Sequence, residues 1–346
     1  MKKKIIIIII LSIFAFILIA GSTLSYIVYQ KIFKTAISQQ APDYLYIPTG
    51  TTYEEMLKII ENENILNDFQ LFKKVAKYKN LDKNVHAGRY KIEKDLSINS
   101  LINKLKTGRQ EAVKLIFNNI KTKEQLSQRI SEQLELNENQ LLKLLNDSVF
   151  LLQYEMNPTT ILCMFIPNTY EFWWNTSATA FIERMYKEYK KFWNQNRRNR
   201  LDTIGLTDIE AIILASIVQE ENHRKDEQAR IAGLYMNRLK KGMLLQADPT
   251  VKYALGDLNV KRILFRDLEI NSPYNTYKYL GLPPGPIRIP EPSAIEAVLY
   301  YEKHNYLYMC AKEDFSGYHN FAVSARQHAI NASKYHQALN RKKIAR

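Results

Sequence analysis

The chain begins with its longest apolar stretch. Residues 5–29 contain no charged side chain, and lysines occupy positions 2–4 just before them. A helix of this length spans the hydrocarbon core of a membrane, which needs about 20 residues. The apolar segment of a signal peptide is shorter, about 7–15 residues, so a cleaved signal peptide is the less favoured alternative. The lysines predict that residues 1–4 stay in the cytoplasm and that residues 30–346 lie outside it.

A small α+β module is predicted after this helix, over residues 43–108. Residues 30–42 are mostly polar and predict a short linker to it. The predicted elements are, in order, a strand from Tyr44, a helix opened by a Thr51–Glu54 capping box, a helical stretch over 67–78, a strand over 89–92 and a helix ended by Gly108.

The remainder of the chain, residues 109–346, has a mainly helical pattern. The predicted elements are helices over 125–133, 137–146, 177–194 and 208–221, an aromatic-rich loop over 165–174, strands over 305–312 and 318–323, and a last helix opened by a Ser324–Gln327 capping box. The turn sequence EDFSG joins the two strands, which predicts a small antiparallel sheet. The predicted fold class is therefore α+β: a transmembrane helix, a small module and a mainly helical domain.

The composition is that of a folded protein, and the net positive charge raises the possibility of an anionic partner. The chain has 346 residues, 46% of them hydrophobic, and a formal net charge of +14. A basic protein in the cytoplasm suggests nucleic acid as a partner, but the predicted location outside the membrane argues against it. Basic residues gather at 184–200 and 341–346. We interpret these patches as solvated helix faces, with an anionic surface as the alternative partner.

The cysteines and histidines indicate neither a disulfide framework nor a metal site. Cys163 and Cys310 each lie in an apolar stretch, which predicts two buried free thiols. The six histidines form no HExxH motif, and the chain contains no CxxC motif or glycine-rich phosphate loop. The sequence therefore predicts no metal and no cofactor.

One apolar helix ends in three polar residues. A Thr207–Glu210 capping box starts the helix, and the sequence ASIVQEE ends it at Glu221. At about 100° per residue, Glu221 continues the apolar stripe, while Glu220 is turned away by about 100° and Gln219 by about 160°.

A carboxyl that emerges from an apolar helix is partly desolvated. Desolvation raises its pKa, which is the condition for a general acid at neutral pH. The alternative is structural, with Glu221 paired to Lys225 and Glu220 paired to Arg224 at i,i+4 spacing on an exposed turn.

Four segments carry a resemblance to a known family. They are ASIVQEE, GLYMNRLKKGMLLQADPTVKYALG, NSPYNTYKYLGLPPGPI and YHNFAVSARQHAINASKY, in that order, within residues 207–335. Together they resemble the MltG family of endolytic murein transglycosylases. The module over 43–108 is similar to the LysM-like domain of that family, and the predicted anchor matches its inner-membrane topology.

The resemblance implies that Glu221 is the catalytic residue. The family motif looks like A-S-I-[IV]-E-x-E, whose second acid is catalytic and falls on Glu221, whereas Gln219 replaces the first acid. Glu220 is the alternative.

The implied activity is cleavage of the β-1,4 bond between N-acetylmuramic acid and N-acetylglucosamine within nascent peptidoglycan strands, leaving 1,6-anhydro ends. The implied partners are the strands and the peptidoglycan synthases (penicillin-binding proteins), beside which the enzyme would terminate new strands. The implied location is the bacterial inner membrane, with the catalytic domain outside the cytoplasm.

The matched segments also supply candidate substrate-binding residues. They are Gln246, Asp248, Tyr274, Asn275, Thr276, Tyr277, His319 and Phe321. Hydroxyls, amides and aromatic rings suit sugar recognition, although a turn after Pro273 explains the YNTY sequence equally well. Asp248 precedes Pro249, a pattern typical of a helix N-cap, so we favour a structural role for it. We interpret GLPPGPI as a rigid loop that shapes the wall of the cleft.

Two other functions remain open. The chain could be a non-catalytic scaffold that binds peptidoglycan, or a muramidase that uses water and takes Asp248 as its second carboxylate. The chemistry of the product ends separates all three.

Overall fold

The computed structural model describes residues 2–256 and 263–341. The chain forms two compact units. One unit comprises Met1–Lys114, Gln133–Glu135 and Glu171–Thr176, and the other comprises Leu115–Glu132, Leu136–Tyr170 and Ser177–Arg346. The described residues are mainly helical and include three two-stranded sheets, which confirms the predicted α+β class.

The apolar N-terminal stretch is one long helix, α1 (Lys2–Phe33). Residues 4–33 are long and apolar enough to cross a membrane. The helix meets the small module that follows, where Lys31 pairs with Asp68 at 3.2 Å. Most of its apolar side chains are exposed, with Ile8 and Phe16 more than half exposed. Such exposure is unfavourable in water and favourable in lipid.

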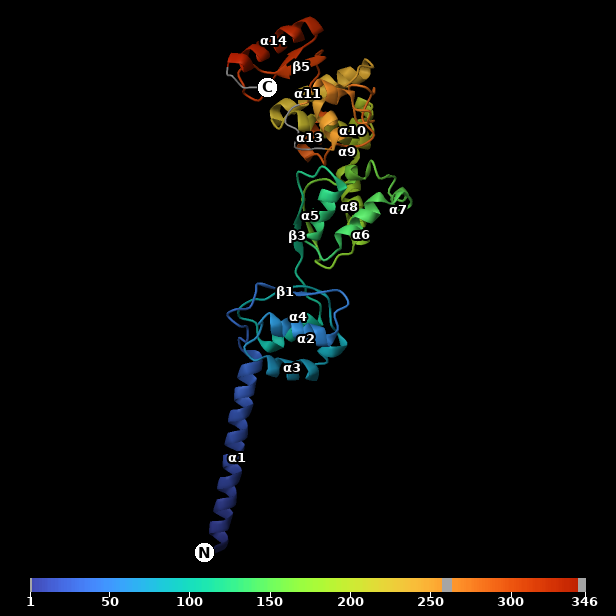
Figure 1. Cartoon of the computed structure of the whole chain (residues 1–346). Helices are drawn as coiled ribbons and strands as arrows, with labels where there is room; N and C mark the ends of the chain where they lie inside the picture. The colour runs from blue at the N-terminus through green and yellow to red at the C-terminus, as the bar shows by residue number, and fades with distance from the viewer. Residues whose placement is uncertain (1, 257–262, 342–346) are drawn as a thin grey trace. The chain divides into compact units, whose positions relative to one another are not determined.

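The small module contains two strands and three helices. They are β1 (Tyr44–Ile47), α2 (Tyr53–Asn62), α3 (Phe69–Tyr78), β2 (Gly88–Lys91) and α4 (Ile98–Lys106), with a 3-10 turn, η1 (Leu81–Lys83), after α3. The strands pair antiparallel, with Tyr44 opposite Lys91, and the helices gather beside them (Figure 1). The capping box of α2 joins Thr52 and Glu55, one residue later than predicted.

The segment predicted as a linker is built into this module. Ala36, Ile37 and Ala41 are buried in its core. Thr35 forms a β-bridge with Ser97, and Ile37 forms another with Leu66. Residues 30–42 are mostly polar, but three apolar side chains and the two β-bridges hold the segment against the module.

The central part of the chain is formed by short helices and two strands. The elements are β3 (Val113–Ile116), α5 (Lys123–Ser131), α6 (Glu138–Asn146), α7 (Ser148–Leu152), η2 (Ile161–Met164), β4 (Thr169–Phe172), α8 (Ala178–Phe192) and α9 (Gln195–Ile204). β3 pairs with β4. The aromatic-rich segment 165–174 was predicted as a loop, which is wrong for Thr169–Phe172, because Tyr170 and Phe172 alternate with exposed residues as in a half-buried strand. The rest of the segment is irregular, as predicted.

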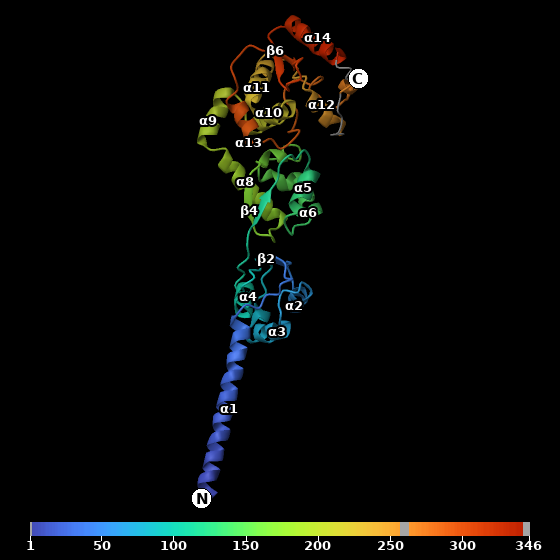
Figure 2. The ribbon, with the colours of Figure 1, turned by 90° about the vertical axis from the view of Figure 1, so that its left-hand side faces the viewer.

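A buried helix, α10 (Asp208–Glu221), organises the rest of the chain. It begins at the predicted Thr207–Glu210 capping box, and every residue from Ala211 to Gln219 is buried. It packs against α11 (Lys225–Lys240), α12 (Asp248–Leu255) and α13 (Pro292–Leu299), as Figure 2 shows. A 3-10 turn, η3 (Phe265–Glu269), lies beside α12.

The last elements are a hairpin and a helix. β5 (Tyr308–Ala311) and β6 (His319–Ala322) pair antiparallel, as predicted, and α14 (Ala325–Arg341) packs on them. The Ser324 hydroxyl accepts a hydrogen bond from the Gln327 N–H, but the Gln327 side chain bonds to Asn331. The second half of the predicted capping box is therefore absent.

Candidate active site

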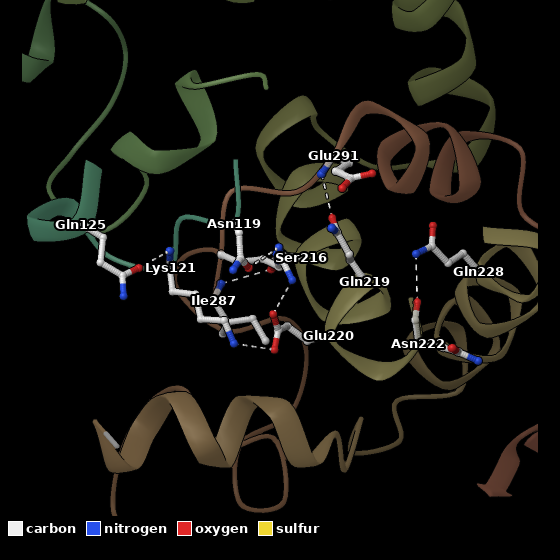
Figure 3. A network of polar contacts seen from close by, with 11 residues as sticks. Asn119, Lys121, Gln125, Ser216, Gln219, Glu220, Asn222, Gln228, Ile287 and Glu291 are labelled. Carbon is white, nitrogen blue, oxygen red and sulfur yellow. Dashed lines mark hydrogen bonds and ion pairs between the residues drawn. The ribbon is translucent and has the colours of Figure 1, made fainter. Parts of the chain in front are cut away.

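The three polar residues at the end of α10 point in three directions. Gln219 is buried, and its Oε1 accepts a hydrogen bond from the Glu291 N–H at 2.7 Å, just before α13. Glu220 lies between two cations: it accepts from Lys121 at 2.8 Å and from Arg288 at 2.5 Å. Figure 3 shows the contact between Lys121 and Glu220 on the side of α10 where Ser216 meets Ile287. Gln219 and Glu220 therefore have structural partners.

Glu221 faces a pocket instead. Its Oε1 accepts a hydrogen bond from the Tyr235 hydroxyl of α11 at 2.5 Å. The pocket has a volume of about 220 Å³ and is lined by twelve residues: Glu221, Leu234, Tyr235, Arg238, Leu245, Gln246, Asp248, Tyr277, Met309, Cys310, Ala311 and His319. The helical geometry inferred from the sequence thus separates Glu221 from its two polar neighbours as the structure does.

The surroundings of Glu221 alter its acidity. Burial raises the pKa of the carboxyl from its ordinary 4.5 to about 7, although the hydrogen bond from Tyr235 opposes the rise. The charge of Asp248 raises this pKa further, whereas His319 and Lys252 lower it. A carboxyl with a pKa near 7 retains its proton in much of the population at neutral pH, as a general acid must.

The alternative i,i+4 ion pairs are wrong. Lys225 pairs with Glu291 at 3.2 Å, and Arg224 donates to the Ser316 carbonyl at 3.0 Å. α10 ends at Glu221, and its C-cap Asn222 has extended backbone angles, so Arg224 and Lys225 do not continue the helical face.

Asp248 lies on the pocket wall and does not cap α12. Ala247 is the N-cap residue of that helix, and Asp248 is its first residue. The Asp248 carboxylate accepts a hydrogen bond from the Tyr277 hydroxyl at 2.6 Å. The predicted N-cap role is therefore wrong, and the two side chains form one polar edge of the pocket.

Gln246 and His319 also line the pocket, but Asn275 and Thr276 do not. Both of the latter are buried. Asn275 donates to the carbonyls of Leu268 and Ile270, and the Thr276 hydroxyl accepts from the Ala247 N–H at 3.0 Å. These contacts hold the turn that carries Tyr277, so the YNTY sequence serves mainly as structure.

Tyr274 and Phe321 also lie away from this pocket. The Tyr274 ring packs against Tyr253 with centroids 4.8 Å apart, and Phe321 packs against Tyr306 at 5.5 Å. The GLPPGPI loop does not line the pocket either. At Gly285 a Cβ would lie 2.2 Å from the Thr159 carbonyl oxygen, so this loop needs glycine to pack closely against the central part of the chain.

Tyr235 and Arg238 are pocket residues that the sequence did not single out. Arg238 is buried and donates to the carbonyls of Leu245 and Leu307 and to Gln246, which ties β5 to the loop before α12. Their spacing of three on one helix places both side chains on the same face, within the second matched segment. This spacing could have identified them as neighbours on one helix face.

The cysteines are both free thiols, but only Cys163 is buried. Cys310 is partly exposed on β5 and lines the pocket, which corrects the prediction of two buried thiols. A second, larger pocket of about 610 Å³ adjoins the first, since Asp248, Tyr277, Cys310 and Ala311 line both. The two pockets therefore share one wall.

Comparison with known proteins assigns the chain to a family. The model of the YceG-like family matches residues 45–334. The endolytic murein transglycosylase of Bacillus subtilis (strain 168) is 30% identical over 318 residues, which cover 86% of this chain and 85% of that protein. The endolytic murein transglycosylase of Streptococcus pneumoniae serotype 2 (strain D39) is 28% identical over 298 residues. That match covers 77% of this chain and 53% of the relative, so the chain spans about half of its length.

A solved structure supports the same assignment. The crystal structure of a YceG-like protein from Listeria monocytogenes aligns with a TM-score of 0.55 and 30% identity, covering 83% of this chain and 98% of that one. The resemblance inferred from the four sequence motifs is thereby confirmed: the chain belongs to the YceG-like family.

Proposed function

We propose that this protein is a membrane-anchored lytic transglycosylase that cleaves peptidoglycan strands internally, with Glu221 as its catalytic residue. The observation that carries the proposal is a carboxyl with a pKa near 7, placed by a buried helix at the wall of a polar pocket. The names of the relatives from Bacillus subtilis and Streptococcus pneumoniae support the substrate class.

The chemistry needs one carboxyl group and no water. Protonated Glu221 donates its proton to the oxygen that bridges C1 of N-acetylmuramic acid and C4 of N-acetylglucosamine, and the C1–O bond breaks. The C6 hydroxyl oxygen of the same muramic acid then bonds to C1, and its proton passes to the Glu221 carboxylate. The acid is regenerated, and the products are a free 4-hydroxyl and a 1,6-anhydro ring.

Tyr235 prepares Glu221 for this cycle. Its hydroxyl occupies Oε1 of Glu221 at 2.5 Å, which leaves Oε2 to carry the transferable proton. The hydrogen bond also stabilises the carboxylate that forms after proton donation. Gln246 and Tyr277 also line the pocket, and their dipoles would stabilise the charge that develops on the sugar.

The membrane anchor suggests where this reaction occurs. α1 is long enough to span a bilayer, and Lys4 with its two lysine neighbours favours a cytoplasmic N-terminus. The catalytic domain would then act outside the cytoplasm on strands as they emerge from the glycan synthases. Cleavage there would terminate their elongation.

The fate of water tests the reaction type. We expect the full-length protein in detergent micelles, given uncrosslinked glycan strands in ¹⁸O-labelled water, to produce 1,6-anhydro ends that contain no ¹⁸O. Mass spectrometry of the product ends measures this directly. Reducing ends with ¹⁸O at C1 would instead identify a muramidase, and intact strands bound to a folded protein would identify a scaffold.

Asp248 offers a second test, through pH. Its charge raises the pKa of Glu221, so Asp248→Asn lowers that pKa. The active form requires a protonated Glu221, and the rate falls as pH rises through this pKa. We therefore expect the alkaline limb of the pH–rate profile, near pH 7 in the wild type, to move to lower pH in the variant.

The same variant separates the transglycosylase from the muramidase. A transglycosylase is expected to retain the rate at pH 5.5 within about tenfold, whereas loss of an obligatory second carboxylate costs about 10²- to 10⁴-fold. If the alkaline limb of the pH–rate profile is unchanged in Asp248→Asn, the charge of Asp248 does not act on Glu221.

A further inference from the structure

A second buried carboxylate lies behind the pocket that contains Glu221. Glu227, in the first turn of α11, is 4% exposed. It receives three hydrogen bonds: from the His319 N–H at 2.9 Å, from His319 Nδ1 at 2.7 Å and from the Asn222 amide at 2.5 Å. A buried acid with this many donors is held in a fixed position and orientation.

The contacts of Glu227 determine its charge. Burial alone raises the pKa of this carboxyl, but the hydrogen bonds from the His319 side chain and backbone and from Asn222 outweigh burial and lower the pKa. Asn222 cannot reverse its amide, because its Oδ1 accepts from the Arg224 N–H at 2.9 Å. Glu227 is therefore an acceptor for all three partners, and His319 Nδ1 must carry a proton.

The His319 side chain is also part of the pocket wall. His319 lines it together with Glu221, and its side chain is 16% exposed. Within the described residues, the hydrogen bonds of the His319 ring go to Glu227 through Nδ1, and Nε2 has no protein partner. In the neutral ring the proton lies on Nδ1 and Nε2 presents a lone pair, whereas in the charged ring, the form that lowers the pKa of Glu221, Nε2 carries a proton as well.

We propose that Glu227 is a positioning residue that holds His319 in the Nδ1–H tautomer, so that Nε2 accepts a hydrogen bond from a hydroxyl or N-acetyl N–H of the sugar beside Glu221. This inference rests on the proposed function, because it concerns the same pocket and substrate. Asn222 follows Glu221 directly, so one hydrogen-bonded unit fixes both the end of the acid's helix and the acceptor.

Glu227→Gln tests the tautomer. We expect the glutamine oxygen to take the Oε1 position, where it keeps the hydrogen bond from the His319 N–H. Its NH₂ group then takes the Oε2 position, where it donates to Nδ1 and moves the ring proton to Nε2, and the Asn222 amide loses its acceptor there. We expect ¹⁵N NMR of the full-length protein in micelles, labelled at histidine, to show Nδ1 protonated in the wild type and Nε2 protonated in the variant. The His319 signals are identified by their absence in His319→Asn.

Activity tests the consequence. His319→Asn keeps a donor for Glu227, so it is expected to fold like the wild type, but it lacks the Nε2 acceptor. Both variants are expected to lose about 10- to 100-fold in kcat/KM on uncrosslinked strands, because the sugar is no longer oriented toward Glu221. A purely structural role for His319 predicts a wild-type rate for His319→Asn.

The outcomes decide the inference separately from the proposed function. An unchanged tautomer in Glu227→Gln, or a wild-type rate in His319→Asn, overturns it. If the wild type yields no anhydro ends, the proposed function is wrong, but the role of Glu227 and His319 can still be tested by binding. The tautomer change together with about tenfold weaker strand binding by His319→Asn would support this role, and unweakened binding would oppose it.

Discussion

Glu221→Gln is expected to lower the rate of anhydro-end formation by about 10²- to 10⁴-fold, the usual contribution of a general acid–base residue. Glutamine keeps the size of the side chain and can accept the hydrogen bond from Tyr235, but it has no proton to give to the leaving oxygen. The loss should appear in kcat, with strand binding retained. Single-turnover cleavage of uncrosslinked strands and a separate binding measurement distinguish the two quantities.

Glu220→Gln is the matched control for this experiment. It makes the same chemical change one residue earlier, at a carboxylate that is bound to Lys121 and Arg288 and does not line the pocket. We expect it to reduce stability but to retain cleavage, with rates compared at a temperature where both variants are folded. If Glu220→Gln abolishes cleavage and Glu221→Gln does not, the assignment of the catalytic acid is wrong.

The sequence was sufficient to predict the direction of Glu221 because α10 is regular from its capping box to its end. Thr207 fixes the first residue, and a period of about 3.6 residues then orients every later side chain. The partners of Glu220 could not be predicted, because they are distant in the sequence. Lys121 and Arg288 lie 99 and 68 residues away along the chain, and no local pattern reports such contacts.

The candidate sugar-binding residues show a second limit. Motif membership does not separate residues that face a ligand from residues that hold the motif together. Thr276 is as much a part of the YNTY segment as Tyr277, yet it is buried against Ala247. Glu227 was missed because its first-turn position on α11 suggests an ordinary helix start, and only the fold brings β6 beside it.

Arg288→Met is expected to destabilise the folded protein by about 3–5 kcal/mol, the cost of breaking a buried ion pair by removing one partner. Arg288 is 3% exposed, and it bridges Glu220 at 2.5 Å and Asn119 at 3.1 Å. Methionine fills similar space but leaves the Glu220 carboxylate with Lys121 as its remaining cation. Urea unfolding in micelles, followed by tryptophan fluorescence, measures the change in the free energy of unfolding.

A double-mutant cycle identifies the source of this effect. In Arg288→Met combined with Glu220→Gln, neither charge of the pair is left without the other, so the combined loss should be smaller than the sum of the two single losses by about 1–3 kcal/mol. If the losses simply add, the contact between Arg288 and Glu220 contributes nothing to stability. The end of α10, and with it the placement of Glu221, would then depend on helix packing and on the contacts of Gln219 and Lys121.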